Sequence, residues 1–195
     1  LSFTITSLGY SKKIIYRNKA LLNNDIYVTG NLGDSFIGLQ ILKNKITVNK
    51  KISKYFINKY YHPELQSKLS SHLFKFANTS IDISDGLIGD LKKMINRQSL
   101  SFLINENKIP ISTNLKKLIT KKKLNKIMTV TNGDDYQILF TASPKKSRII
   151  ESISKNVGVK ITKIGKIISG KKKSFVIDTK GKQIRAINNA YRHKF

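Results

Sequence analysis

The sequence predicts a mixed α/β fold, an α+β sandwich in which helices pack against a β-sheet of mixed strand direction. Three observations support this prediction. Short β-rich runs end at glycines, apolar residues with helical spacing follow them, and two hairpin-like strand patterns come near the end of the chain. The 195 residues, 39% of them hydrophobic, suffice for one domain with its own core.

The first part of the chain alternates strand and helix patterns. Residues 2–9 carry a weak strand alternation, and the β-rich run at 25–30 is stopped by glycine. A helical pattern follows, with Phe36, Ile37, Leu39, Ile41 and Leu42. Two amphipathic stretches come next, at 52–60 and 65–76, and we expect both to be helical.

The second part continues the alternation. The apolar stripe of Leu87, Leu91 and Met94 predicts a helix. Ser143 and Pro144 form an N-cap and first-turn pair for another helix. The predicted elements are, in order, a strand at 79–83, a helix at 85–98, a strand at 100–104, a short helix at 115–120, a strand at 136–141, a helix from 143 to 156, and strands at 161–169 and 174–179.

The chain is strongly basic, with 37 Lys and Arg against 11 Asp and Glu and a formal net charge of +26. Such a charge raises the possibility of a nucleic-acid-binding module, because Lys and Arg make phosphate contacts. Nearly all of the charge is lysine, however, whereas bidentate recognition of phosphates and bases favours arginine. The pattern therefore favours a solvated lysine surface over nucleic acid as a partner.

Other features bound the class of protein. The chain has no cysteine, so disulfides and thiolate metal sites are excluded. No run approaches the ~20 apolar residues that span a bilayer, and no leader pattern opens the chain. We expect a cytoplasmic protein without membrane partners. Because Leu1 opens the chain inside a strand pattern, we also expect that an upstream part of the natural chain is missing here.

A first acidic motif stands at 81–87, where a strand passes into a helix. The alternation of Ile81, Asp82 and Ile83 turns the carboxylate away from the buried face. Asp85 follows at the helix start, where free N–H groups attract anions. Mg²⁺ prefers carboxylate oxygens combined with substrate phosphates, so Asp82 and Asp85 could converge on one cluster. The alternative is that Ser84 or Asp85 serves only as an N-cap.

A second acidic motif, Asn132-Gly133-Asp134-Asp135-Tyr136, precedes a predicted strand. A glycine beside two acids suits a tight turn that presents a carboxylate to a ligand, although an ordinary turn is the alternative. The turn over residues 30–34 could cradle a phosphate, but it lacks the Gly-Lys-Ser/Thr of a Walker motif, and a structural role is favoured.

Taken in order, these motifs resemble the C-terminal half of bacterial thiamine-monophosphate kinase, within the aminoimidazole ribonucleotide synthetase-like superfamily. The resemblance rests on the order and spacing of four segments and on Tyr191 and His193 near the end. The segments are Asp25-Ile26-Tyr27-Val28-Thr29-Gly30-Asn31-Leu32-Gly33-Asp34, Ser80-Ile81-Asp82-Ile83-Ser84-Asp85-Gly86-Leu87-Ile88-Gly89-Asp90-Leu91, Gly133-Asp134-Asp135-Tyr136-Gln137-Ile138-Leu139-Phe140 and Ile161-Thr162-Lys163-Ile164-Gly165-Lys166-Ile167.

The resemblance implies Mg²⁺-dependent, direct transfer of a phosphoryl group from ATP to thiamine monophosphate, giving thiamine diphosphate. It implies that Asp82 and Asp85 are Mg²⁺ ligands. The other implied roles are ATP contacts for Arg17 and Ser84, and thiamine monophosphate contacts for Asp134 and Tyr191. No catalytic residue is assigned.

The resemblance also divides the chain. Residues 1–22 would end a truncated N-terminal ATP-binding domain, and residues 23–195 would form the C-terminal domain. The full-length family member would be a homodimer, and the piece alone would be inactive. The alternatives are another ATP-using enzyme of the same superfamily, a basic nucleic-acid-binding module, and a decayed copy that has lost its activity.

Overall fold

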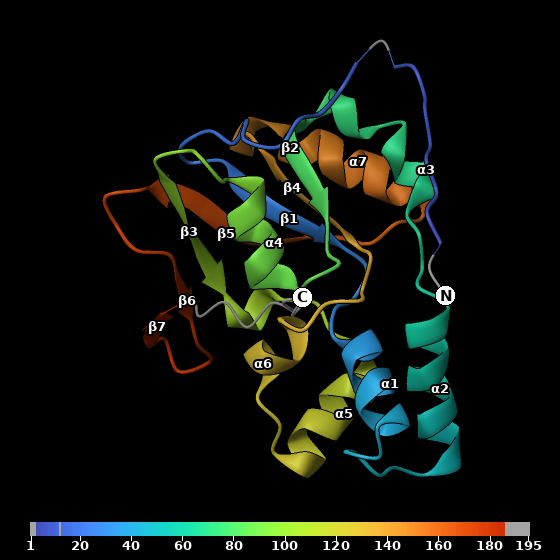
Figure 1. The fold of residues 1–195 in the computed structure, drawn as a ribbon. Helices are drawn as coiled ribbons and strands as arrows, with labels where there is room; N and C mark the ends of the chain where they lie inside the picture. Colours follow the sequence, from blue (N-terminus) through green and yellow to red (C-terminus); the bar gives the residue numbers. More distant parts are fainter. Residues whose placement is uncertain (1–2, 12, 186–195) are drawn as a thin grey trace.

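A computed structural model describes residues 3–11 and 13–185 of the chain (Figure 1). The strands are β1 (Asp25–Thr29), β2 (Ala77–Asp82), β3 (Leu100–Asn105), β4 (Ile138–Ala142), β5 (Ile161–Ser169), β6 (Phe175–Ile177) and β7 (Gln183–Arg185). The α-helices are α1 (Asp34–Leu42), α2 (Lys50–Tyr61), α3 (Ser67–Ser70), α4 (Leu87–Met94), α5 (Thr113–Lys122), α6 (Lys126–Val130) and α7 (Ser147–Val157). Three 3₁₀ turns complete the list, Leu73–Lys75, Glu106–Lys108 and Pro144–Lys146.

The strands form one seven-stranded sheet in the order β2-β4-β1-β5-β3-β6-β7. All neighbouring pairs are antiparallel except β3 and β6, which run parallel. The sheet is therefore mixed, and the predicted fold class is confirmed.

Strand β1 lies inside the sheet and separates two apolar layers. Ile26 and Val28 face one layer, and Tyr27 faces the other, as the alternation of side chains along a strand requires. The first layer contains helix α4, which buries Leu87, Ile88, Leu91 and Met94. The second layer contains α3 and α7. Tyr27 stacks on Phe140 there, with ring centroids 5.2 Å apart. Figure 1 shows α4 and α7 at the sheet.

A third apolar cluster joins α1, α2 and α5 beyond the end of the sheet (Figure 1). Ile37 and Phe56 are fully buried in it. Helices α1 and α2 approach closely at Gly38, where an added Cβ would lie 2.3 Å from the carbonyl oxygen of Phe56. This pair of helices places Asp34 and Tyr55 beside the sheet end described below.

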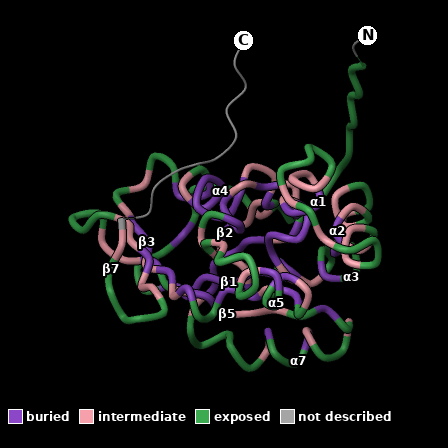
Figure 2. Tube along the Cα trace, turned by 90° about the horizontal axis from the view of Figure 1, so that it is seen from below, coloured by how far each residue is buried: buried purple, intermediate pink, exposed green. Residues whose placement is uncertain are grey.

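Most predicted elements are present, and a few differ. Residues 3–9 form no strand. Phe3, Ile5 and Leu8 in this stretch, and Tyr10 just after it, are almost fully exposed, and Figure 2 shows the stretch running away from the packed body. The stretch at 65–76 contains only α3 and a 3₁₀ turn, and the helix predicted at 85–98 covers only 87–94. Helix α6 and strand β7 were not predicted. No helix among the described residues is long and apolar enough to cross a membrane.

Candidate active site

Four strand ends meet at one edge of the sheet. Thr29 at the end of β1 pairs with Ile161 at the start of β5, and Asp82 at the end of β2 pairs with Ile138 at the start of β4. The Thr29 hydroxyl accepts a hydrogen bond of 2.8 Å from the Ile138 N–H, which joins the two halves of this edge. The glycine turn at 30–34 and both acidic motifs therefore lie at the same edge.

The two acidic motifs are hydrogen-bonded to each other through their backbones. The Asp134 N–H donates to the Ser84 carbonyl at 2.9 Å, and the Tyr136 N–H donates to the Ile83 carbonyl at 2.8 Å. Asp134 and Tyr136 have positive φ angles of 61° and 50°, which bend the second motif around the first. The side chains of Asp82, Ser84, Asp85 and Asp134 thus project from one small assembly, which we call the acidic corner.

Glycines allow this close contact. A Cβ on Gly86 would lie 2.2 Å from the Thr131 carbonyl oxygen, and a Cβ on Gly133 would lie 2.2 Å from the Ser84 carbonyl oxygen. Both glycines also have positive φ angles, 111° and 82°, which side chains disfavour. The glycine in each motif is therefore needed for the two motifs to touch.

Asp90 supports the acidic corner from inside. Its Oδ2 atom accepts hydrogen bonds from the N–H groups of Asp85 and Gly86, at 2.8 and 3.0 Å, and the residue is fully buried. Burial raises the pKa of Asp90 to about 6; the hydrogen bond from Gly86 opposes this, and the charge of Asp82 adds to it. Asp90 therefore fixes the backbone that carries Asp85.

Helix α4 has no side-chain cap of the kind considered above. Its N-cap is Gly86, so neither Ser84 nor Asp85 occupies that position. Instead the Asp90 carboxylate, in the first turn, reaches back to the free N–H groups. The N-cap alternative is therefore not supported, and the Ser84 and Asp85 side chains are left for other contacts. Asp85 is ion-paired with Lys93, which also pairs with Asp90 at 3.2 Å.

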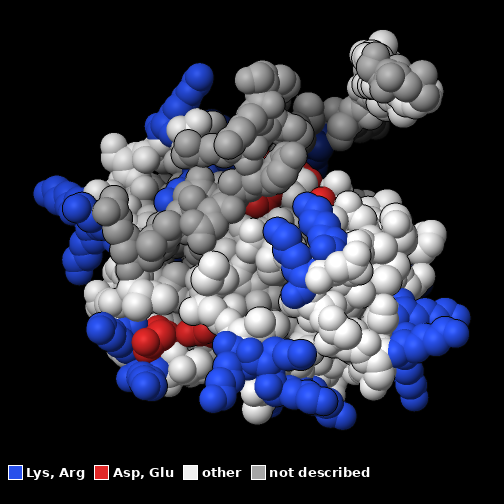
Figure 3. Space-filling model, turned by 60° about the horizontal axis from the view of Figure 1, so that its bottom comes forward, with Lys and Arg blue, Asp and Glu red and all other residues white. Residues whose placement is uncertain are grey.

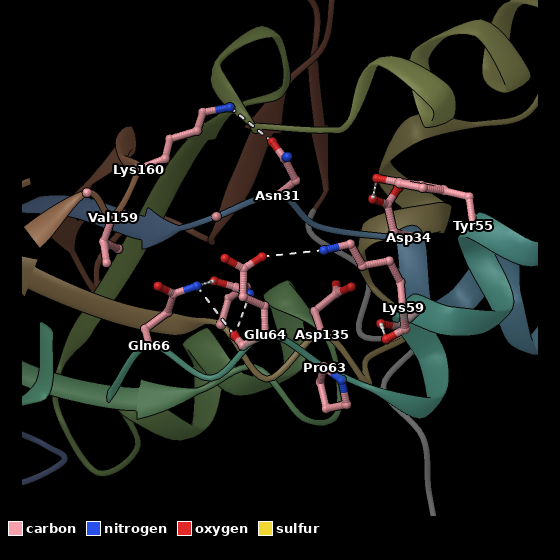
Figure 4. A pocket seen from close by; sticks show the side chains of 14 residues that line it. Asn31, Asp34, Tyr55, Lys59, Pro63, Glu64, Gln66, Asp135, Val159 and Lys160 are labelled. Carbon is pink, nitrogen blue, oxygen red and sulfur yellow. Dashed lines mark hydrogen bonds and ion pairs between the residues drawn. The ribbon is translucent and has the colours of Figure 1, made fainter. Parts of the chain in front are cut away.

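A cavity of about 200 Å³ lies beside the acidic corner, between the glycine turn and helix α2 (Figure 4). Two buried carboxylates line it, Asp34 and Asp135. Both Asp135 oxygens accept from the Gly33 N–H, at 3.0 and 2.8 Å. The Asp34 carboxylate accepts from the hydroxyls of Tyr55 at 2.8 Å and Ser112 at 2.7 Å. The second motif thus reaches the corner through Asp134 and this cavity through Asp135.

The two carboxylates of the cavity have perturbed acidities. Burial raises the pKa of Asp135 to about 8; the hydrogen bond from Gly33 opposes the change, and the charge of Asp34 adds to it. Burial also raises the pKa of Asp34, against the hydrogen bonds from Ser112 and Tyr55 and the nearby charge of Lys59. The raised pKa of Asp135 favours its protonated form below about pH 8.

Polar side chains complete the cavity on its other side. Gln137 accepts hydrogen bonds from Thr29 at 2.8 Å and from Gln66 at 3.1 Å. On the rim, Lys160 donates to Asn31 at 2.9 Å (Figure 4). Lys59 pairs with Glu64 at 3.4 Å on the same rim. The cavity is therefore polar, and most of the polar side chains around it form hydrogen bonds or ion pairs with one another.

The predicted site residues have different positions. Asp82, Ser84, Asp85 and Asp134 are brought together at the acidic corner. Arg17 is exposed and adjoins Asn18, whose N–H donates to the Met94 carbonyl at 2.8 Å, so it lies near the opposite end of α4 from the corner. Tyr191 lies outside the described residues. Roles in binding ATP, substrate or metal remain predictions for all six.

Sequence reasoning gave no role to Asp90, Lys93, Asp34 or Asp135. The available signal for the first two was their place in a helix that begins at a glycine, with an acid in its first turn. For Asp135 the signal was the doubled acid of the second motif. The role of Asp34 depends on long-range contacts with Tyr55 and Ser112, which spacing does not reveal.

The donor set of the acidic corner is compatible with a divalent cation. Asp82 and Asp85 offer carboxylate oxygens, which Mg²⁺ prefers, and the Lys93 ammonium on Asp85 shows that the corner accepts a positive charge. The described residues contain no group of three or more His, Cys, Asp or Glu that could hold a metal. A cation bound here would therefore need further ligands, such as phosphate oxygens.

Comparison with solved structures defines the fold class of the chain. The chain shares the aminoimidazole ribonucleotide synthetase-like fold. The hydrogenase maturation protein HypE of E. coli, for example, superimposes with a TM-score of 0.63 at 11% identity, covering 88% of this chain and 52% of that one. At this identity the likeness shows the fold alone. No family model matches the sequence.

Closer similarity points to one group within this class. A thiamine-monophosphate kinase from Buchnera aphidicola (subsp. Acyrthosiphon pisum, strain APS) is 40% identical over 171 residues, which are 86% of this chain and 52% of the relative. The solved complex of AaThiL with AMPPCP and TMP has a TM-score of 0.71 at 29% identity, over 87% of this chain and 52% of that one. The chain is similar to thiamine-monophosphate kinases over most of its residues, as the motifs predict, and spans about half their length.

Proposed function

We propose that this chain is the C-terminal half of a kinase that transfers a phosphoryl group from ATP to thiamine monophosphate, giving thiamine diphosphate. The observation that carries the proposal is the acidic corner, in which two distant motifs are joined by backbone hydrogen bonds so that their carboxylates share one sheet edge. The similarity to thiamine-monophosphate kinases supports the same activity, and the AaThiL complex with AMPPCP and TMP supports the two substrates.

The corner suits phosphoryl transfer, which depends on positioning and on neutralising charge more than on covalent chemistry. Mg²⁺, when bound, would neutralise the charge on the transferred phosphates. Asp82 and Asp85 would hold the cation, and the Ser84 hydroxyl would contact the nucleotide. Asp134, which burial makes less acidic than an exposed aspartate, would face the cationic thiazolium of the substrate. Arg17 and Tyr191 remain proposed contacts to ATP and thiamine monophosphate.

The rest of the activity would come from the other half of the protein. We infer that residues 1–22 end a first domain and that 23–195 form the second. The proposal includes a homodimer for the complete protein, its location in the cytoplasm, and no turnover by these 195 residues alone. The alternative of another enzyme with the same fold is less well supported, because the relatives at 30–40% identity are thiamine-monophosphate kinases, whereas HypE is only 11% identical.

The test is an assay of the complete protein with thiamine monophosphate, ATP and Mg²⁺, measuring thiamine diphosphate. We expect Asp85→Ala to reduce kcat/KM at least about 100-fold, since the electrostatic clamp on the phosphates would be lost. Its circular dichroism and melting temperature should stay close to those of the wild type. Glu151→Ala, which removes an exposed carboxylate on α7, is the matched control and should retain full activity.

The outcomes separate the candidate functions. Normal turnover by Asp85→Ala would refute the role of the corner. Failure of the wild type to phosphorylate thiamine monophosphate, with transfer of the phosphoryl group of ATP to a different acceptor, would favour a sister enzyme of the same fold. Tight binding of DNA or RNA with a steep salt dependence, unaffected by Asp82→Ala, would favour the nucleic-acid module.

A further inference from the structure

Lys93 occupies a position that the proposed function leaves unexplained. Its ammonium group, one turn beyond Asp90 on α4, pairs with Asp85 Oδ2 and with Asp90 Oδ1. The Asp85 side chain is 28% exposed and the Lys93 side chain 46%, whereas Asp90 is only 1% exposed. The lysine therefore bridges an open carboxylate that faces the site and a closed one that supports it.

The Lys93 ammonium group offsets the repulsion between the carboxylates of the acidic corner. The charge of Asp82 acts on Asp90, and Asp85 is joined to Asp90 through its own N–H. Negative groups held this close repel one another unless a cation stands among them. The Lys93 ammonium group supplies that cation from within the chain, at one of the two carboxylates that the proposed function assigns to Mg²⁺.

We propose that Lys93 is an internal counter-ion of the acidic corner, which a divalent cation must displace from Asp85 in order to bind there. The inference rests on the proposed metal role of Asp82 and Asp85. Displacement breaks only one of the two contacts, because Asp90 keeps its own pairing with the ammonium group. Lys93 thus lowers the affinity for the cation and keeps the corner assembled when no cation is bound.

The test is a titration of the 195-residue chain with Mn²⁺ at fixed ionic strength, followed by electron paramagnetic resonance of the free ion into the millimolar range. Mn²⁺ favours the same oxygen ligands as Mg²⁺. We expect Lys93→Met to lower the dissociation constant about three- to tenfold, since a competing positive charge is removed. Lys93→Arg keeps the charge and should bind like the wild type.

Two further variants locate the effect. Lys155→Met removes a lysine that pairs with Glu151 at 2.8 Å on α7, and it should leave Mn²⁺ affinity unchanged. Asp85→Asn added to Lys93→Met should abolish the gain. Circular dichroism checks that each variant is folded.

Each outcome supports or overturns the inference. A gain in Lys93→Met alone, lost with Asp85→Asn, supports it. If Lys93→Met binds Mn²⁺ like the wild type while Asp85→Asn weakens binding, the counter-ion role is wrong and the metal role stands. If Asp85→Asn changes Mn²⁺ binding neither alone nor when added to Lys93→Met, the proposed metal role fails and the counter-ion role falls with it.

Discussion

Asp134 and Asp135 are adjacent in the chain but belong to different surroundings. Asp134 is half-buried at the corner, whereas Asp135 is buried in the cavity, where the Gly33 N–H binds both of its oxygens. The doubled acid was visible in the sequence, and so was the grouping of glycines with acids. Which carboxylate would point inward was not, because that depends on the positive φ angles of Asp134 and Tyr136 and on contacts with a turn about 100 residues away.

Asp135 should make stability depend on pH. Its pKa is raised to about 8 in the folded chain, while an unfolded aspartate releases its proton near about 4. The folded state therefore binds more protons between these values, so this contribution is complete below about pH 4 and is lost as the pH rises to about 8. We expect the free energy of unfolding, from urea titrations, to fall with pH more steeply in the wild type than in Asp135→Asn, by at most about 1.4 kcal/mol per pH unit.

The control for this prediction is Glu151→Gln, which changes an exposed carboxylate on α7 and should keep the wild-type slope. Parallel curves for the wild type and Asp135→Asn would show that the carboxyl group is ionised in the folded chain across this range.

At the scale of elements, helix α4 shows where sequence patterns succeed and fail. The apolar stripe of Leu87, Leu91 and Met94 correctly predicts a helix against the sheet. Its length was overestimated at both ends. Gly86 adopts a φ of 111° before the helix, and the chain turns at Arg97, with a φ of 61°, to enter β3. Both limits are set by the backbone conformation of single residues, to which a periodic pattern is insensitive.

The elements that were missed are too short to show a periodic pattern. Helix α6 is only five residues long and is started by the Asn125 side chain, which accepts from the Met128 N–H at 3.0 Å. Strand β7 has three residues and exists through its pairing with β6. The strand predicted at 2–9 does not form, because the described part of that stretch has no neighbouring strand to pair with.

Asp90 should control the start of α4. Asp90→Ala leaves the N–H groups of Asp85 and Gly86 without their acceptor inside the protein, and we expect it to lower the free energy of unfolding by about 2–4 kcal/mol. Asp90→Asn keeps one acceptor oxygen of nearly the same shape and should lose clearly less. Urea unfolding of both variants is the measurement. Equal losses for alanine and asparagine would mean that the carboxylate does not hold these two groups.

For the whole molecule, the excess of positive charge is the dominant property. Figure 3 shows Lys and Arg side chains at many places around one face, with few acids between them. The formal net charge of +26 disfavours the compact state through self-repulsion, which salt screens. The sequence alone gives this charge.

We therefore expect the melting temperature of the chain to rise with added NaCl, because the screening length shrinks from about 30 Å at about 0.01 M to about 3 Å at about 1 M. Calorimetry in the two buffers is the measurement. Replacing the exposed Lys171, Lys172 and Lys173 by glutamine should reduce this salt response. A melting temperature that does not change with salt, in the wild type or in the glutamine variant, would contradict the prediction.

The exposed stretch at residues 3–10 has a practical consequence. Phe3, Ile5, Leu8 and Tyr10 stand in water without a covering layer, beside a surface that is otherwise rich in lysine. Large exposed apolar groups that lie near one another favour association between chains. The 195 residues, purified alone, should therefore aggregate as their concentration rises, although the folded body stays intact. A mild detergent should reverse this aggregation.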